Sequence, residues 1–106
     1  MPTVKEIFEA MPASFQKDAV QGMNVVIQFD ITGEGGGKWC AAINNSELSI
    51  VETAHDKPDL TITASAQDYI DISSGKLNPQ LAFMTGRIRA RGDMILAMMM
   101  PKIFKE

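Results

Sequence analysis

The chain has 106 residues and a formal net charge of −3, and 45% of its residues are hydrophobic. This length predicts a single domain spanning residues 1–106, and no disulfide forms within it because Cys40 is the only cysteine. The slight negative charge gives no reason to expect a nucleic-acid partner, since phosphate binding normally requires a basic excess. The longest apolar run has seven residues, far below the ~20 that span a bilayer. We find no signal peptide, so we expect a cytoplasmic protein without a transmembrane segment.

The first predicted element is an amphipathic helix. Thr3 and Glu6 have the spacing of a capping box, in which each side chain binds the backbone N–H of the other residue. Apolar residues then recur at helical intervals, and Pro12 interrupts the pattern because proline cannot donate a backbone hydrogen bond. We therefore expect this helix to end at about Met11.

Between residues 23 and 64 the apolar period changes from 3.6 to 2, which is typical of strands with one buried face. A Gly-rich stretch over residues 33–37 predicts the first turn. Asn44-Asn45-Ser46 predicts a second tight turn, because asparagine tolerates a positive φ. The sequence thus predicts four strands here, of which the first three are antiparallel.

The helical period then returns. Ser65 predicts the cap of a helix that continues to Ser74, and Asn78-Pro79 predicts the start of a short helix that ends near Met84. A last strand is predicted to begin at Gly86. Helices therefore bracket a run of strands, which predicts an α+β fold with helices on one face of a mostly antiparallel sheet.

The final segment, "GDMILAMMMPKIFKE", is apolar on every side from Met94 to Met100. Gly92-Asp93 predicts its start. Pro101 is expected to kink or break the helix, so that a second short turn follows it.

Motifs for catalysis or metal binding are not found. His55 is the only histidine, and no serine or cysteine motif provides it with a partner, so we interpret it as a solvated loop residue. We interpret Cys40 as a small packed residue. The stretch "GEGGGKW" lacks the Ser or Thr that follows the lysine of a phosphate loop, and it precedes a strand, so we interpret it as a hairpin turn. We therefore expect no enzyme activity, no cofactor and no metal.

Arg87, Arg89 and Arg91 are two residues apart and so share one face of the last strand. Two interpretations remain open. The arginines form either a solvated outer face that resists aggregation, or a contact for an anionic group such as a carboxylate or the phosphate of coenzyme A.

The second half of the chain contains the stretch "PDLTITASAQDYIDISSGKLNPQLAFMTGRIRARGDMILAM". It closely resembles the sterol carrier protein-2 family of lipid- and sterol-transfer domains. The first half agrees more loosely, through its amphipathic helix, its Gly-rich turn and Lys38-Trp39. The features that match in the second half are residues 59–62, 68–69, 75–79, 82–83, 86, 92–94 and 96–98.

This resemblance implies a five-stranded, mostly antiparallel sheet covered on one face by helices, with an apolar tunnel between sheet and helices. It also implies non-covalent binding of a fatty acid, a fatty acyl-CoA or a sterol in that tunnel, without a cofactor. Two departures stand out. Asn44-Asn45-Ser46 replaces an Asp-Gly-type turn, and Ala90 stands where a larger aliphatic side chain is usual, which would widen the tunnel beside it.

The final segment indicates an apolar ligand independently of the resemblance, because a helix that is apolar on all sides needs an apolar neighbour on each side. An alkyl chain would supply that neighbour, at ~0.8 kcal/mol for each methylene buried. Methionine suits such a wall, since its flexible side chain adapts to ligands of different shape.

We therefore predict a non-catalytic protein that binds and carries a fatty acid, fatty acyl-CoA or sterol-like lipid inside the cell. An alternative remains open, in which the apolar C-terminal segment forms a homodimer interface or docks on a lipid-metabolising enzyme. The predicted tunnel residues are Ile27, Phe29, Tyr69, Ile72, Leu81, Met84, Ile88, Met94, Met98, Met99, Met100 and Phe104.

Overall fold

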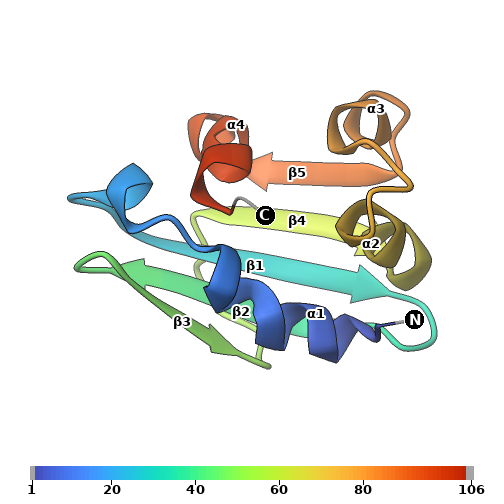
Figure 1. Ribbon diagram of the computed structural model, residues 1–106, viewed down its shortest axis with the longest axis horizontal. Coiled ribbons are helices and arrows are strands. Elements are labelled where there is room, and N and C mark those ends of the chain that lie inside the picture. Colours follow the sequence, from blue (N-terminus) through green and yellow to red (C-terminus); the bar gives the residue numbers. More distant parts are fainter. Residues whose placement is uncertain (1, 105–106) are drawn as a thin grey trace.

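Five strands form one mixed sheet, and the helices pack on one of its faces, which we call the inner face (Figure 1). The computed structural model describes residues 2–104. Strands follow the order β3-β2-β1-β4-β5, and only β1 and β4 pair in parallel. The predicted α+β fold is therefore confirmed. The strands are β1 (Asn24–Thr32), β2 (Gly37–Asn44), β3 (Glu47–Val51), β4 (Leu60–Ser65) and β5 (Ile88–Gly92).

The first helix, α1 (Val4–Ala10), begins with the predicted capping box. The Thr3 hydroxyl accepts from the Glu6 backbone N–H at 3.1 Å, and the Glu6 carboxylate accepts from the Thr3 N–H at 3.0 Å. Pro12 lies in the 3₁₀ helix that follows, η1 (Met11–Ser14), so the predicted end of α1 is also confirmed. A second 3₁₀ helix, η2 (Lys17–Val20), leads into β1.

The hairpin between β2 and β3 closes through two residues, Asn45 and Ser46, with φ of 55° and 62°. Positive φ at both central positions matches the twist of the flanking strands. The predicted tight turn is therefore confirmed, and it fixes which side chains of β2 and β3 face the helices.

The connection from β3 to β4 lies on the outer face of the sheet, over Gln28. The Gln28 amide donates to the Thr53 carbonyl at 3.3 Å, and its oxygen accepts from the His55 N–H at 2.7 Å. This segment buries Gln28, although its side chain is on the face of the sheet opposite to the helices. The crossing brings β4 to the far side of β1, where the two strands run parallel.

The helices after the sheet begin where the sequence predicts. Helix α2 (Ala66–Ser73) follows Ser65, whose hydroxyl accepts from the Asp68 N–H at 3.1 Å. Helix α3 (Pro79–Met84) follows Asn78, whose side chain accepts from two backbone N–H groups. These caps satisfy backbone donors that the first helical turn leaves unpaired.

The last helix, α4 (Met94–Ile103), begins after Asp93 and continues through Pro101. The predicted break at Pro101 is wrong. The fixed φ of Pro101 is compatible with a helix, and its missing N–H removes only one backbone hydrogen bond. The helical turn after Pro101 is stabilised by contacts with other parts of the chain. Ile103 is fully buried, and its carbonyl accepts from the Gln16 N–H at 2.8 Å.

Candidate functional site

Aromatic side chains fill the inner face over β1 and β2. Phe8 of α1 is fully buried, and its ring stacks on Trp39 with centroids 4.9 Å apart and on Tyr69 with centroids 5.0 Å apart. Its edge contact with Phe29 has a centroid distance of 5.1 Å. Burial raises the pKa of the Tyr69 hydroxyl, which keeps it neutral. This half of the inner face is therefore occupied by protein side chains.

The other half of the inner face, over β4 and β5, is only partly covered, as are Val25, Leu48 and Ile50 on the first half. Three apolar residues of these strands, Ile62, Ile88 and Ala90, point to the inner face and are only partly buried. Ile62 lies at the centre of β4, between the buried inner-face residues Leu60 and Ala64, so its partial exposure is not an effect of the strand ends. We call these three residues the inner strip.

The inner strip is only partly covered because the helices pack at its two ends. Helix α4 packs on β5 and β4, where Leu60 is paired with Gly92. Helix α2 packs on β4 at the opposite end, close to Ala64, and α3 packs on β5 (Figure 1). Both flanking helices also carry partly buried apolar side chains, namely Tyr69, Ile70 and Ile72 on α2 and Ala97, Met99 and Met100 on α4.

The structure divides the predicted tunnel residues into groups. One group lies in the core or packs against it: Ile27, Phe29, Tyr69, Met99, Met100 and Phe104. Ile88 belongs to the inner strip, and Ile72 is partly buried on α2, which borders it. The remaining four are exposed, with exposed fractions of 55% for Leu81, 81% for Met84, 42% for Met94 and 80% for Met98.

Helical geometry explains the exposure of Met98. Leu96 is buried, and two residues along an α-helix correspond to a rotation of about 200°. Met98 therefore lies on the side of α4 opposite to Leu96. The apolar character of α4 on all sides, evident in the sequence, leaves part of its surface without a protein neighbour.

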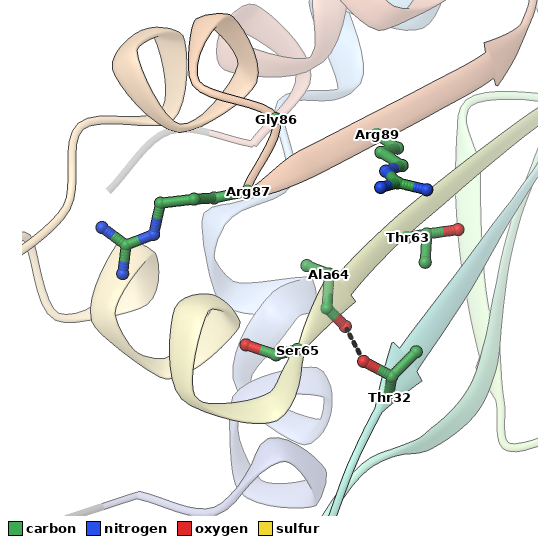
Figure 2. A pocket seen from close by; sticks show the side chains of 7 residues that line it. All are labelled: Thr32, Thr63, Ala64, Ser65, Gly86, Arg87 and Arg89. Carbon is green, nitrogen blue, oxygen red and sulfur yellow. Dashed lines mark hydrogen bonds between the residues drawn. The ribbon is translucent and has the colours of Figure 1, made fainter.

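Polar side chains line two shallow cavities on the outer face. The first, of about 240 Å³, is bordered by Thr63 and Arg89, and the second, of about 390 Å³, by Thr61, Arg89 and Arg91. Figure 2 shows Arg89 beside Thr63, whereas Arg87 points away from both. Neither cavity is the apolar tunnel that the resemblance implies, and that tunnel stays a prediction.

Arg87 is engaged by α2. Two nitrogens of its guanidinium donate to one oxygen of the Asp68 carboxylate, at 3.1 and 2.6 Å. This contact lowers the pKa of the Asp68 carboxyl and raises that of Arg87. It ties the first turn of α2 to the residue that precedes β5, at one end of the inner strip.

Groups that could act as a nucleophile, base or metal ligand are dispersed. His55 is exposed, and its Nδ1 accepts from the Lys57 N–H at 3.1 Å. Cys40 is buried, and burial raises the pKa of its thiol, which disfavours the reactive thiolate. Within residues 2–104, no three His, Cys, Asp or Glu side chains are grouped as a metal site would require. The described helices include none long and apolar enough to cross a membrane.

Sequence patterns alone did not single out two residues of the inner strip, Ile62 and Ala90, as site residues. Alternation along β4 indicates that Ile62 faces inward, and the small size of Ala90 was already visible as a departure from the family pattern. Whether such residues are covered depends on where α2 and α4 pack, which no local signal specifies.

Comparison with known proteins agrees with the fold. The profile of the SCP-2 sterol transfer family matches residues 4–105. The chain belongs to this family. The match includes the inner strip, the flanking helices α2 and α4 and the aromatic cluster around Phe8.

Similar proteins include chains of about this length and chains several times longer. Hydroxysteroid dehydrogenase-like protein 2 of Bos taurus is 32% identical over 97% of this chain, which spans only about a quarter (25%) of that protein. Palmitated SCP2L2 of Aedes aegypti has a TM-score of 0.77 at 22% identity, with 99% of this chain and 96% of that one covered. The sec-alkylsulfatase Pisa1 of Pseudomonas sp. has a TM-score of 0.82 at 15% identity, covering 99% of this chain and 17% of that one. These structural likenesses show the fold.

Proposed function

We propose that this SCP-2 domain binds the alkyl part of a lipid along the inner strip and carries it without chemical change. The observation that supports this most directly is the partial exposure of Ile62, at the centre of β4, together with that of the β5 residues Ile88 and Ala90, on the sheet face that carries the helices. An apolar ligand there would complete the burial that α2 and α4 leave unfinished.

The energetics favour a chain-like ligand. Each methylene that the strip buries contributes ~0.8 kcal/mol, so a long acyl chain would contribute on the order of 10 kcal/mol before the costs of binding. Met99 and Met100 would adapt to chains of different length through their flexible side chains. The four exposed residues of the predicted tunnel would contact a ligand only where it leaves the inner strip. They are Leu81, Met84, Met94 and Met98.

A fatty acid or its coenzyme A ester is the ligand class that we propose, with a sterol-like lipid as a further member. The Aedes aegypti relative was studied in its palmitated form, which supports an acyl chain as a ligand for this fold. The family description also names sterol transfer.

An equilibrium titration with a fluorescent fatty acid tests this proposal. We expect saturable uptake by the purified domain and displacement by unlabelled fatty acid, together with retained lipid in native mass spectra of protein isolated from cells. Failure to take up or retain any aliphatic ligand would contradict the proposal.

A second function is favoured by the exposed apolar residues of α3 and α4 and by the relatives that contain a dehydrogenase-like part. In this alternative the domain docks on a lipid-metabolising enzyme or forms a homodimer. Sedimentation over a wide range of concentrations tests for self-association, and a concentration-dependent dimer that takes up no ligand would favour the alternative.

A further inference from the structure

Four polar side chains of β4 and β5 lie together on the outer face of the sheet, opposite to the helices. Thr61 is paired with Arg91, and Thr63 is paired with Arg89. Residues two apart along a strand share a face and are about 7 Å apart, and neighbouring strands are about 5 Å apart. Two hydroxyls and two guanidiniums therefore extend from one small area of the sheet. We call these four residues the outer-face site.

The outer-face site is hollowed. The cavity of about 240 Å³ and the cavity of about 390 Å³ on this face share Thr63 and Arg89 among their lining residues. Figure 2 shows the Arg89 side chain extended beside Thr63, whereas Arg87 points away from it. Because the two cavities share a wall, Arg89 and Arg91 border one continuous depression and can contact the same ligand.

The two arginines of the site have no acidic partner within residues 2–104. Arg87 differs from them, since its guanidinium donates to the Asp68 carboxylate at 2.6 Å. Both Arg89 and Arg91 are exposed, and they remain charged because a guanidinium does not lose its proton in proteins. Two positive charges on this area of the sheet are therefore not neutralised by ion pairs within the described chain.

Two acids adjoin the site, and both bind other groups. Asp30 of β1 lies next to Thr63 in the sheet, but its carboxylate is 4.0 Å from the Lys38 ammonium and accepts from the Gln28 amide at 3.3 Å. Asp59 precedes β4, and its carboxylate accepts from the Val26 N–H at 2.7 Å. Neither acid is within ion-pair distance of a guanidinium of the site.

These groups suit an anion with several oxygens. A guanidinium presents its N–H donors as a planar fork that fits two oxygens of a phosphoryl group, and a threonine hydroxyl donates one further hydrogen bond. The area is too small for a nucleic-acid duplex, and a chain with a net charge of −3 lacks the basic excess that such a partner requires. The chemistry therefore favours a small phosphorylated molecule.

We propose that the outer-face site binds the diphosphate group of a small ligand, with one guanidinium on each phosphoryl group. The sheet separates this site from the inner strip, so diphosphate binding does not depend on lipid uptake. Two sources carry this group. One is a free nucleoside diphosphate. The other is a coenzyme A ester whose acyl chain lies on the inner strip and whose diphosphate reaches the outer face around β5, and this second source rests on the proposed function.

The test is a titration of the ¹⁵N-labelled full chain with inorganic pyrophosphate, followed by amide NMR. We expect saturable shifts of the amide signals of the four residues of the site, and weaker binding as salt is added. Arg89→Gln combined with Arg91→Gln should raise the dissociation constant on the order of tenfold or more, because each variant loses a charge-assisted contact. Thr63→Val keeps the shape of the side chain and should raise it about threefold.

A matched control removes the same charge from the other face of the sheet. Lys5→Gln with Lys17→Gln removes two exposed cations from α1 and η2, and it should leave the affinity for pyrophosphate unchanged. Absence of saturable shifts at the outer-face site would overturn the proposal. An equal loss of affinity in the lysine control would overturn it as well, because binding would then follow net charge alone.

Titrations with ADP and with palmitoyl-CoA distinguish the two sources. If the source is a coenzyme A ester, Arg89→Gln with Arg91→Gln should weaken binding of palmitoyl-CoA on the order of tenfold and leave binding of palmitate unchanged. If the source is a free nucleotide, the same variant should weaken binding of ADP only. A loss for neither ligand would overturn the proposal. Failure of palmitate uptake alone would contradict the proposed function and not the diphosphate site.

Discussion

Replacing Ile88 by serine should weaken ligand binding more than it weakens the fold. Complete burial of an isoleucine side chain contributes about 1.5–3 kcal/mol. Ile88 is already partly buried on β5, so covering it with a ligand would add about half of this, or ~1 kcal/mol. The expected result is therefore a roughly fivefold rise in the dissociation constant for a fatty acid. The assay is displacement of a fluorescent fatty acid at equilibrium.

Val51→Ser is the matched control for this variant. Val51 is also an aliphatic β-branched residue of an edge strand, but it lies on β3, at the opposite edge of the sheet. Urea unfolding of both variants should show a similar loss of free energy of unfolding, about 1 kcal/mol or less. Wild-type affinity in Ile88→Ser, or an equal loss of affinity in Val51→Ser, would refute the assignment of the ligand to the inner strip.

Further predictions concern the fold around the site. Phe8→Ala removes the ring stacked between Trp39 and Tyr69, and it should lower the free energy of unfolding by about 3–5 kcal/mol in urea titrations. Gln28→Ala leaves the β3–β4 connection without its buried amide partner, and it should lower the free energy of unfolding by about 1–3 kcal/mol in the same titrations. The contact with Arg87 lowers the folded-state pKa of Asp68 below its ordinary value of 3.8. The ionised Asp68 therefore contributes fully to stability above pH 3.8, and this contribution is lost as the pH falls through the folded-state pKa. Asp68→Asn should remove this part of the acid dependence, as unfolding at a series of pH values would reveal.

Local signals in the sequence were sufficient for most element boundaries. The Thr3 capping box, the cap at Ser65 and the Asn78-Pro79 start each act through hydrogen bonds within a few residues, and the structure contains all of them. The Asn45-Ser46 turn is equally local, because its two positive φ angles decide the hairpin register.

What the sequence patterns did not predict depends on contacts between distant segments. The parallel pairing of β4 with β1 follows from a connection whose Thr53 and His55 backbone groups bind Gln28, 25 and 27 residues away along the chain. The continuation of α4 past Pro101 depends on Ile103, which is buried and bonded to the segment before β1. Neither contact leaves a periodic signature in the sequence.

The candidate site shows the same division. Alternation correctly assigned Ile27 and Phe29 to the inner face, and the resemblance correctly implied helices above it. Partial cover of Ile62 arises only because α2 and α4 pack at opposite ends of β4 and β5. The apolar residues on all sides of α4 predicted that part of its surface has no protein neighbour. The sequence of α4 does not specify which of its methionines face the core.

Methyl-group NMR of the domain during titration with palmitate tests the central claim most directly. With labelled isoleucine and methionine methyl groups, we expect the largest shifts at Ile62, Ile88, Met99 and Met100, and small ones at Met23, which packs against the core on the side of β1. A saturable shift confined to the first four residues is the result predicted here. Equal shifts at Met23, or no shift at Ile62 and Ile88 under conditions where palmitate is bound, would contradict a ligand on the inner strip.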